Sequence, residues 1–552
     1  MFCKAAEHRT PDSIRCNSHR DGYGRGTRAP PPRSSGETYY GSVEYTYDAA
    51  GNRETMTGNP EPLGTTIAPG TTTYDYDALD RLVSVTFPGP KTVSYQYDDL
   101  PGGDAADYPG QRTQITYPDS KTVTYTYLQD GAMETVTDWL SQQTAYTYDD
   151  AGRLDLTQLP NGVSADYGYD EANRLTSVVN TAAGPTTISS FTYVLDAVGN
   201  RLSMTDANND THEYEYDALY RLTEVTYPGP ETDTYTYDGN GNRLTKNATT
   251  YQYSSGDELE SVDGATYWQD NNGNDIIRAD TQSFSYDHEN RIKSASNIPY
   301  SPQYDGDGLR TSLGPGAQWP GQVEFTWDVA SALPVIIQDT DVTYVYGLDL
   351  ISATDSGGEQ TYFTYDGLGS VTDLTDGTGA VTATFTYDVF GAVRSQTGAS
   401  DTYWRFAGEQ TDAATGFQYL RARYYDPGTG RFLTRDPLRG TALNPQTHNP
   451  YAYGLNNPVN RVDPRGLASE SADWQDRLIE ELLFQECLKF VLVTAALAIL
   501  AFGFFGAPLF ISTLGIPVAL QLLVALELQI AAAAATGAAA GIGYAAYKIC
   551  TR

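Results

Sequence analysis

The chain has 552 residues, of which 70 are acidic and 35 basic, so its formal net charge at neutral pH is −35. Such an acidic chain argues against nucleic acid as a partner, because binding phosphates requires a basic face. Tyrosine (43 residues) and glycine (52 residues) are unusually frequent, and this usage is typical of half-buried β-strands joined by turns.

Residues 1–37 show neither hydrophobic periodicity nor the apolar stretch of a secretory signal peptide, and we expect a disordered lead here. None of the four cysteines falls within residues 38–343, so neither a zinc site nor a disulfide framework is expected there. We expect no cofactor and no metal.

Residues 38–343 repeat a Tyr-x-Tyr-Asp unit that is followed by Arg-Leu, in several units after Gly-Asn. In the most regular stretch the aspartates are Asp196, Asp217 and Asp238, which are spaced 21 residues apart. A fixed period of this size indicates a repeat architecture, in which each unit stacks on its neighbours.

Each unit has the pattern of a β-hairpin. Both tyrosines fall on one face of a strand because strand side chains alternate, and the Asp and Gly-Asn supply a turn with positive φ. A single hairpin is marginal alone, so we expect a mainly β fold in which the hairpins form one spiral sheet or partial shell. The tyrosines and aspartates would then be structural, with contact to a glycan as the alternative. Residues 270–275 match a calcium loop only loosely, and we interpret them as another turn.

Residues 344–467 end in three stretches: RARYYDPGTGRFLTRDPLRG from Arg421, NPYAYGLNNPVN from Asn449, and RVDPRGL. In order and spacing they resemble the core of the RHS (YD-repeat) family, polymorphic-toxin type. The resemblance covers roughly residues 39–467. It implies a β-strand shell that encloses a C-terminal cargo and cuts itself from that cargo.

The resemblance also implies an aspartyl-protease-like site in which Asp436 and Asp463 form a dyad, Arg423 supports it, and the chain is cut once between Leu467 and Ala468. Two close carboxylates cannot both stay ionised, so one can activate a water while the protonated one polarises the scissile carbonyl. This chain departs from the family pattern in the DPLRG motif and in a longer spacer between the two aspartates. The alternative is that each Asp-Pro pair only caps a turn, as we expect for Asp426-Pro427.

After Leu467 the composition becomes strongly apolar. Residues 468–489 have the pattern of an amphipathic helix, and residues 490–552 that of a hydrophobic helical hairpin, with no charge between Phe490 and Leu526. Glu527 inside the second apolar stretch would face a partner helix or a water-filled path. Gly537 and Gly541 would allow close helix packing in lipid.

The sequence thus favours a secreted or cell-surface toxin whose β-shell releases a membrane-inserting effector by self-cleavage. A lipid membrane, an immunity protein and a delivery or capping partner are the partners expected, and nucleic acid is not. The alternative is a non-enzymatic cell-surface YD-repeat protein that its C-terminal helices anchor in the membrane.

Overall fold

The computed structural model describes residues 14–16, 42–60, 66–98, 110–184, 186–279, 281–296, 301–314, 322–400, 402–438, 440, 444–467 and 469–471. All of them belong to one compact unit, Thr10–Trp474. The expected disordered lead and the expected hydrophobic C-terminal segment lie outside the described residues.

The described residues contain β-strands and three short 3-10 helices but no α-helix, which confirms a mainly β fold. The first 22 strands form one sheet in which consecutive strands pair antiparallel, as the hairpin repeats predict. Its strands are β1 (Ile14–Cys16), β2 (Ser42–Tyr47), β3 (Arg53–Asn59), β4 (Gly70–Tyr76), β5 (Leu82–Phe87), β6 (Lys91–Tyr97), β7 (Arg112–Thr116), β8 (Thr122–Tyr127), β9 (Met133–Thr137), β10 (Gln143–Tyr148), β11 (Leu154–Gln158), β12 (Ser164–Tyr169), β13 (Leu175–Thr181), β14 (Thr187–Leu195), β15 (Arg201–Asp206), β16 (Thr211–Tyr216), β17 (Leu222–Thr226), β18 (Thr232–Tyr237), β19 (Arg243–Lys246), β20 (Thr249–Tyr253), β21 (Leu259–Val262) and β22 (Ala265–Thr266).

Five smaller antiparallel sheets follow in chain order, with 4, 3, 8, 4 and 2 strands. Their strands are β23 (Trp268–Gln269), β24 (Asp275–Arg278), β25 (Gln282–Tyr286) and β26 (Ile292–Ala295); β27 (Pro302–Tyr304), β28 (Arg310–Leu313) and β29 (Val323–Glu324); β30 (Thr326–Asp328), β31 (Val335–Gln338), β32 (Val342–Tyr346), β33 (Leu350–Asp355), β34 (Gln360–Tyr365), β35 (Val371–Asp376), β36 (Val381–Tyr387) and β37 (Val393–Gly398); β38 (Gln410–Thr411), β39 (Gln418–Leu420), β40 (Arg423–Asp426) and β41 (Arg431–Phe432); β42 (Arg461–Val462) and β43 (Glu470–Ser471). The 3-10 helices are η1 (Phe406–Gly408), η2 (Pro445–His448) and η3 (Tyr453–Asn456).

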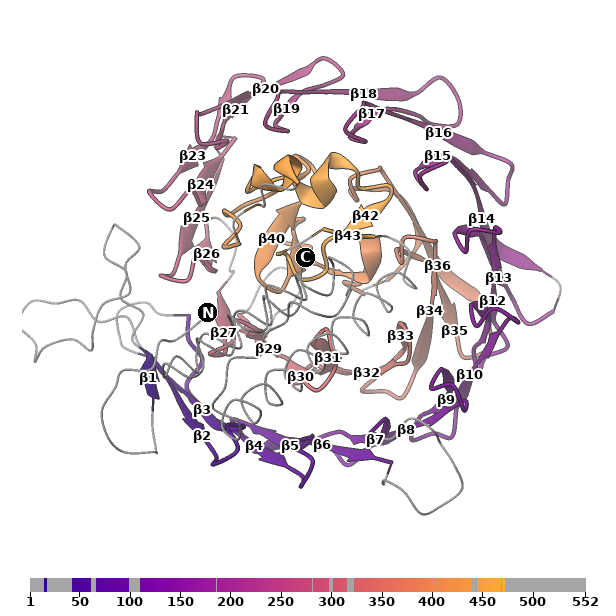
Figure 1. Ribbon diagram of the computed structural model, residues 1–552, viewed down its shortest axis with the longest axis vertical. Coiled ribbons are helices and arrows are strands. Elements are labelled where there is room, and N and C mark those ends of the chain that lie inside the picture. Colours follow the sequence, from indigo (N-terminus) through magenta and orange to yellow (C-terminus); the bar gives the residue numbers. More distant parts are fainter. Residues whose placement is uncertain are drawn as a thin grey trace, which may run out of the picture. The chain divides into compact units, whose positions relative to one another are not determined.

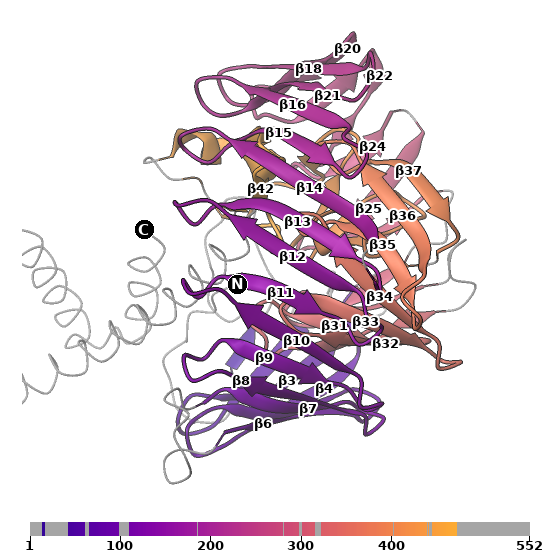
Figure 2. The same ribbon diagram turned by 90° about the vertical axis from the view of Figure 1, so that its right-hand side faces the viewer.

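The strands of this unit wind as a spiral. In Figure 1 the first sheet follows the rim and β30–β37 lie inside it, while Figure 2 shows the strands of the rim stacked side by side. The chain turns inward at β27, where the Tyr304 amide donates to the Thr66 carbonyl (2.8 Å) and the Tyr304 carbonyl accepts from the Ala68 amide (2.7 Å). The sheet therefore overlaps its own beginning.

The inner turn of the spiral packs against the rim through buried contacts. The hydroxyl of Tyr117, on the rim, donates to the Tyr344 carbonyl on β32 (2.7 Å). One core cluster joins rim residues such as Val123 to inner residues such as Ile351, both of which are buried. One part of the hydrophobic core is thus the layer between the two turns, because a sheet exposes two faces and the spiral covers the inner one. Another part lies further inside, where strands of the inner turn pack against β38–β41, as Trp327 does against Tyr419.

Several repeats close their turn with an aspartate–arginine pair, which we call the turn clip; in others, such as Asp196–Asn200 and Asp238–Asn242, an asparagine replaces the arginine. At β16–β17 the Asp217 carboxylate accepts from the amides of Leu219 (2.9 Å) and Arg221 (3.0 Å) and from Arg221 Nε (2.6 Å). Arg221 also donates to the Asp238 carbonyl one repeat later (2.8 Å) and lies over the Tyr237 ring. The same clip recurs at Asp77–Arg81, Asp149–Arg153, Asp170–Arg174 and Asp287–Arg291.

The two tyrosines of a repeat lie on the inner face, as predicted. Tyr235 on β18 is 2% exposed and its neighbour Thr236 points outward. The second tyrosine, Tyr237, is partly buried and donates its hydroxyl to the Leu222 carbonyl of the preceding strand (2.8 Å). A tyrosine thus fills the core with its ring and also donates a hydrogen bond to the neighbouring strand. A phenylalanine could not make that bond.

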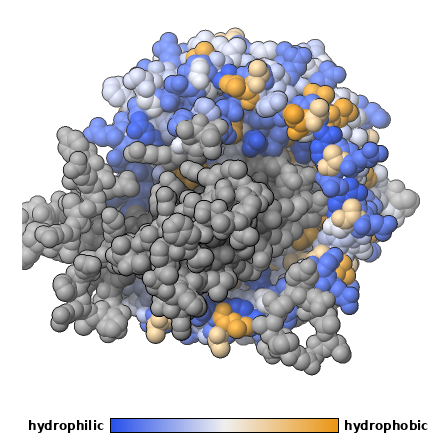
Figure 3. Space-filling model, viewed as in Figure 1, coloured by the Kyte–Doolittle hydropathy of each residue, from blue (hydrophilic) through white to orange (hydrophobic). Residues whose placement is uncertain are grey.

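The described surface in Figure 3 is mostly hydrophilic, in line with the acidic composition. Several of the large apolar side chains that reach solvent stand at turns, among them Leu79, Leu140 and Leu219. Residues 270–275 form a turn of the same kind, in which the Asp270 carboxylate accepts from the Asn274 amide (3.0 Å). Among the described residues no group of His, Cys, Asp and Glu side chains is arranged to hold a metal.

We expect Asp217→Ala to lower the free energy of unfolding by about 2 kcal/mol, because the turn loses three hydrogen bonds to one carboxylate. Asp217→Asn keeps an oxygen acceptor for the two amides and should lose less than half as much. The measurement is the denaturant midpoint followed by tyrosine fluorescence. Equal losses in the two variants would contradict a role for the amide bonds.

Candidate functional site

Arg423 on β40 brings the two predicted aspartates together. Its Nη2 lies 2.7 Å from Oδ2 of Asp436 and 3.4 Å from Oδ2 of Asp463. Arg423 and Asp463 are buried, while the Asp436 side chain is 17% exposed. Because one nitrogen contacts both carboxylates, the two aspartates are neighbours in space despite the long spacer between them.

Burial dominates the electrostatics of these groups. It raises the pKa of Asp436, and the lowering effect of Arg423 is smaller. Burial also lowers the pKa of Arg423 more than the two aspartates raise it. The guanidinium carbon lies 3.6 Å from the centre of the Phe432 ring, which covers one face of the charge. The site is therefore a buried cation between two carboxylates, one of which solvent can reach.

The main chain of the 463–467 loop is held by three consecutive core residues. The Arg421 side chain donates to the Pro464 carbonyl (2.7 Å), the Ala422 amide to the Arg465 carbonyl (3.3 Å), and Arg423 Nε to the Gly466 carbonyl. The arginine at 421 is itself fixed by Glu409 (2.6 Å). Three consecutive carbonyls of the loop backbone are thus held by residues 421–423.

The hydrogen bonds that hold the loop backbone end at Leu467, the residue before the expected cut. The Leu467 amide donates to Oδ1 of Asp463 (2.9 Å), while its carbonyl oxygen accepts no hydrogen bond from any described residue. Gly466 has a positive φ of 65°, and a Cβ there would come within 2.6 Å of the Leu420 carbonyl oxygen. Only glycine fits this close approach without strain. Ala468, on the other side of the expected cut, lies outside the described residues.

Sequence reasoning did not predict what the NPYAYGLNNPVN stretch does. Its asparagines fasten the core to turns of the rim. At one turn Asn449 Nδ2 donates to Oδ1 of Asn242 (2.9 Å), and Asn456 Nδ2 donates to the Gly241 carbonyl (2.8 Å). Further along, the Arg201 amide donates to Oδ1 of Asn460 (2.9 Å). The number of asparagines in one short loop was the available signal, because asparagine can bond backbone donors and acceptors at once.

The third Asp-Pro pair forms the turn that we expected and a further contact. The Asp426 carbonyl accepts from the Gly430 amide (2.8 Å), which closes the turn between β40 and β41. Its carboxylate also pairs with Arg278 of β24 (2.5 Å), which lowers the pKa of Asp426 against the opposing effect of burial. Asp426 therefore ties the core to the rim and stands apart from the Arg423 site.

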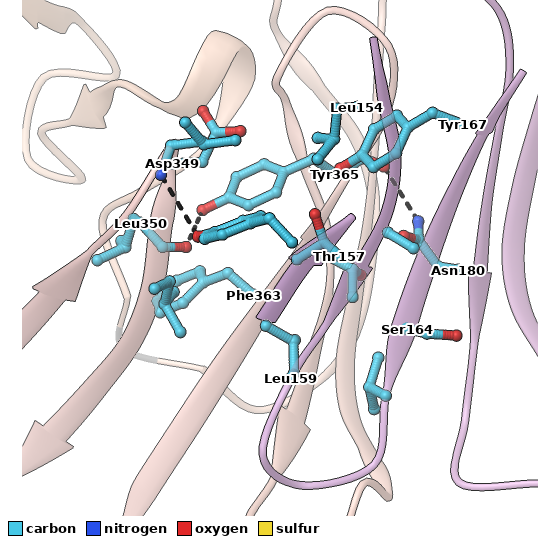
Figure 4. Close-up of a pocket in the computed structure, with 16 residues that line it drawn as sticks. Leu154, Thr157, Leu159, Ser164, Tyr167, Asn180, Asp349, Leu350, Phe363 and Tyr365 are labelled. Atoms are coloured by element: carbon cyan, nitrogen blue, oxygen red, sulfur yellow. Dashed lines mark hydrogen bonds between the residues drawn. The ribbon is translucent and has the colours of Figure 1, made fainter. Parts of the chain in front are cut away.

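A cavity lies elsewhere in the unit, between β11–β13 of the rim and β33–β34 of the inner turn (Figure 4). Its volume of about 40 Å³ leaves room for only a few water molecules. Asn180 reaches across it to donate to the Tyr365 carbonyl (3.0 Å), and the Tyr365 hydroxyl donates to the Leu350 carbonyl (2.5 Å). None of the predicted site residues lines this cavity.

The predicted membrane residues Phe490, Glu527, Gly537 and Gly541 lie outside the described residues. Within the part of the chain that the structure describes, no helix is long and apolar enough to cross a membrane.

Comparison with known proteins gives concordant matches. The family model of the teneurin YD-shell matches residues 197–312 and 337–459. The tRNA3(Ser)-specific nuclease WapA of Bacillus spizizenii is 32% identical over 292 residues, which cover 51% of this chain and 11% of WapA. Toxin subunit YenC1 of Yersinia entomophaga is 25% identical over 457 residues, which cover 80% of this chain and 38% of YenC1.

A solved structure of the Tc holotoxin pore of Photorhabdus luminescens has a similar fold, with a TM-score of 0.57 at 18% identity. The match covers 79% of this chain and 27% of that chain. This chain thus spans only a small part of the relatives that it matches. The Tyr-Asp repeats and these sequence matches agree in making the chain similar to the YD-shell proteins of the RHS (YD-repeat) family, and the spiral sheet has the fold of a solved Tc toxin structure.

Proposed function

We propose that this chain is a shell-forming toxin that cuts itself once after Leu467 and so releases residues 468–552 as its effector. The observation that carries the proposal is the Arg423 site: two aspartates contact one buried guanidinium, beside a loop whose backbone is held as far as the Leu467 amide. The relatives include a nuclease and a toxin subunit, and this supports toxicity as the purpose.

In the proposed reaction the ionised aspartate takes a proton from water while the water oxygen attacks the Leu467 carbonyl carbon. The protonated aspartate donates its proton to the carbonyl oxygen. The bond to the nitrogen of Ala468 then breaks as the aspartate that took the water proton passes it to the leaving nitrogen. A hydroxyl of the diol intermediate returns a proton to the other aspartate, which gives a carboxylic acid at Leu467 and a new amino terminus. Asp436 can serve as the acid, because burial raises its pKa.

Arg423 has a positioning role in this scheme. It holds both carboxylates through Nη2 and the Gly466 carbonyl through Nε, so that catalytic groups and substrate share one support. Before the cut, the same contacts would stabilise the loop as a purely structural ion-pair cluster. In the non-enzymatic alternative the chain is not cut, and the ion-pair cluster only stabilises the fold. The protein would then stay at the cell surface, with residues 490–552 as its membrane anchor.

The effector, residues 468–552, is proposed to insert into a lipid membrane. Its uncharged stretch from Phe490 to Leu526 is long enough to span one, and Glu527, Gly537 and Gly541 would line or pack the helices there. A toxin of this kind requires an immunity protein in the producing cell and a partner for delivery or for capping the shell. We place the protein outside the cell that makes it.

Asp436→Asn and Asp463→Asn should each slow formation of the fragment that begins at Ala468 by roughly a thousandfold or more, because each removes one member of the dyad. Intact-mass spectrometry of the purified full chain measures this. Asp376→Asn, at a turn aspartate outside the site, is the matched control and should be cut like the wild type. An uncut wild-type chain, or unimpaired cutting in both dyad variants, would refute the protease.

The rate of cutting should be highest in mild acid and fall as the pH rises. Burial raises the pKa of Asp436, so the folded site keeps the required proton to a higher pH than a free aspartate does, and loses it as the pH passes that raised value. The measurement is the fraction cut against time from about pH 4.5 to about pH 8. Circular dichroism at each pH controls for unfolding, and a rate that increases with pH would contradict Asp436 as the acid.

Inducing residues 468–552 alone in bacteria should stop growth and collapse the membrane potential, because an inserted helical bundle conducts ions. A potential-sensitive dye measures the collapse. The variant Glu527→Leu removes the charge from the apolar stretch and should insert with less leakage. Clean insertion with normal growth would favour the anchor, and a loss of intracellular RNA before any loss of potential would replace the membrane effector with a nuclease.

A further inference from the structure

The residues on either side of the proposed cut are both held by main-chain contacts. On the N-terminal side of the cut, residues 421–423 bind three consecutive carbonyls of the loop. On the C-terminal side of the cut, β43 pairs antiparallel with β42, with Arg461 opposite Ser471 and Val462 opposite Glu470. The loop between them is thus the end of a β-hairpin.

β42 is a rigid strand on which to dock a chain. Val462 is 1% exposed and belongs to the core cluster that also contains Leu420, Phe432 and Tyr453. The residue before β42, Asn460, is fixed to the rim, where its Nδ2 donates to the Tyr216 hydroxyl (2.9 Å). The residue after it is Asp463 of the proposed dyad. A strand that pairs with β42 is therefore held at a fixed position relative to Asp463, and no other element is needed to position it.

Main-chain pairing is sufficient to account for this docking. The Ser469 hydroxyl is buried and has no hydrogen-bond partner among the described residues, although it lies between the cut position and β43. A strand pair supplies affinity through N–H and C=O groups, which every residue except proline provides in full.

We propose that β42 is the substrate-docking strand of the self-cleaving site: residues 470–471 add to it by main-chain hydrogen bonds and thereby hold the bond after Leu467 in place. This inference rests on the proposed function and names the element that positions its substrate. The recognised chemistry is an extended peptide backbone, whatever side chains it carries.

The test uses the full chain and the rate of appearance of the cut fragment. In an antiparallel pair the N–H groups of neighbouring residues point alternately towards and away from the partner, so both residues of β43 are changed together. The variant E470P/S471P removes both N–H groups, and E470A/S471A keeps them while removing both side chains. A proline beyond the pair, Ala472→Pro, controls for stiffness.

We expect the alanine variant and Ala472→Pro to cut within about twofold of the wild type, and the double-proline variant to be slower by about tenfold or more, the effect of one lost hydrogen bond. Unchanged resistance of residues 42–467 to added protease shows that the shell still folds. Wild-type cutting by the double-proline variant, or equal slowing of the alanine variant, overturns the docking strand. Failure of the wild-type chain to be cut at all refutes the proposed function itself.

Discussion

The turn clip is the interaction on which the rest of this structure depends. One aspartate closes a hairpin by accepting two amides and an arginine, and that arginine reaches the carbonyl and the tyrosine of the next repeat. A local turn and a contact between neighbours are thus the same set of bonds. Since each hairpin is marginal alone, the array is stable only as a continuous sheet, and the clip repeats this coupling along the rim.

A sheet of this length must bury one face, and here it does so by winding onto itself. The tyrosines of the rim face the strands of the inner turn, and the layer between them is one part of the hydrophobic core. The winding also decides where the chemistry lies. It carries the chain inward, so that the core residues after β37 meet the turns of rim strands that precede them by about 200 positions, as the Asn449–Asn242 bond shows.

The Arg423 site combines two demands that oppose each other. A guanidinium between two carboxylates favours their charged forms, whereas burial favours the neutral form of an acid, and for Asp436 burial is the larger effect. Such a site can hold a proton on one aspartate at a pH where an exposed aspartate has lost it. The backbone grip on residues 464–466 fixes the loop independently of these charges.

The sequence alone determined the repeats. The 21-residue spacing, the Tyr-x-Tyr alternation and the turn aspartates are local patterns, and a hairpin follows from them because its bonds join residues close in the chain. The motifs around Arg423, Asp436 and Asp463 were visible for the same reason. Their meeting was not, because the longer spacer leaves it open whether the two aspartates face each other. Only the tertiary structure decided that one guanidinium contacts both, that asparagines of the core bind the rim, and that β42 carries the strand beyond the proposed cut. These contacts join residues up to about 260 positions apart, and their geometry follows from the winding of the sheet, which no local pattern specifies.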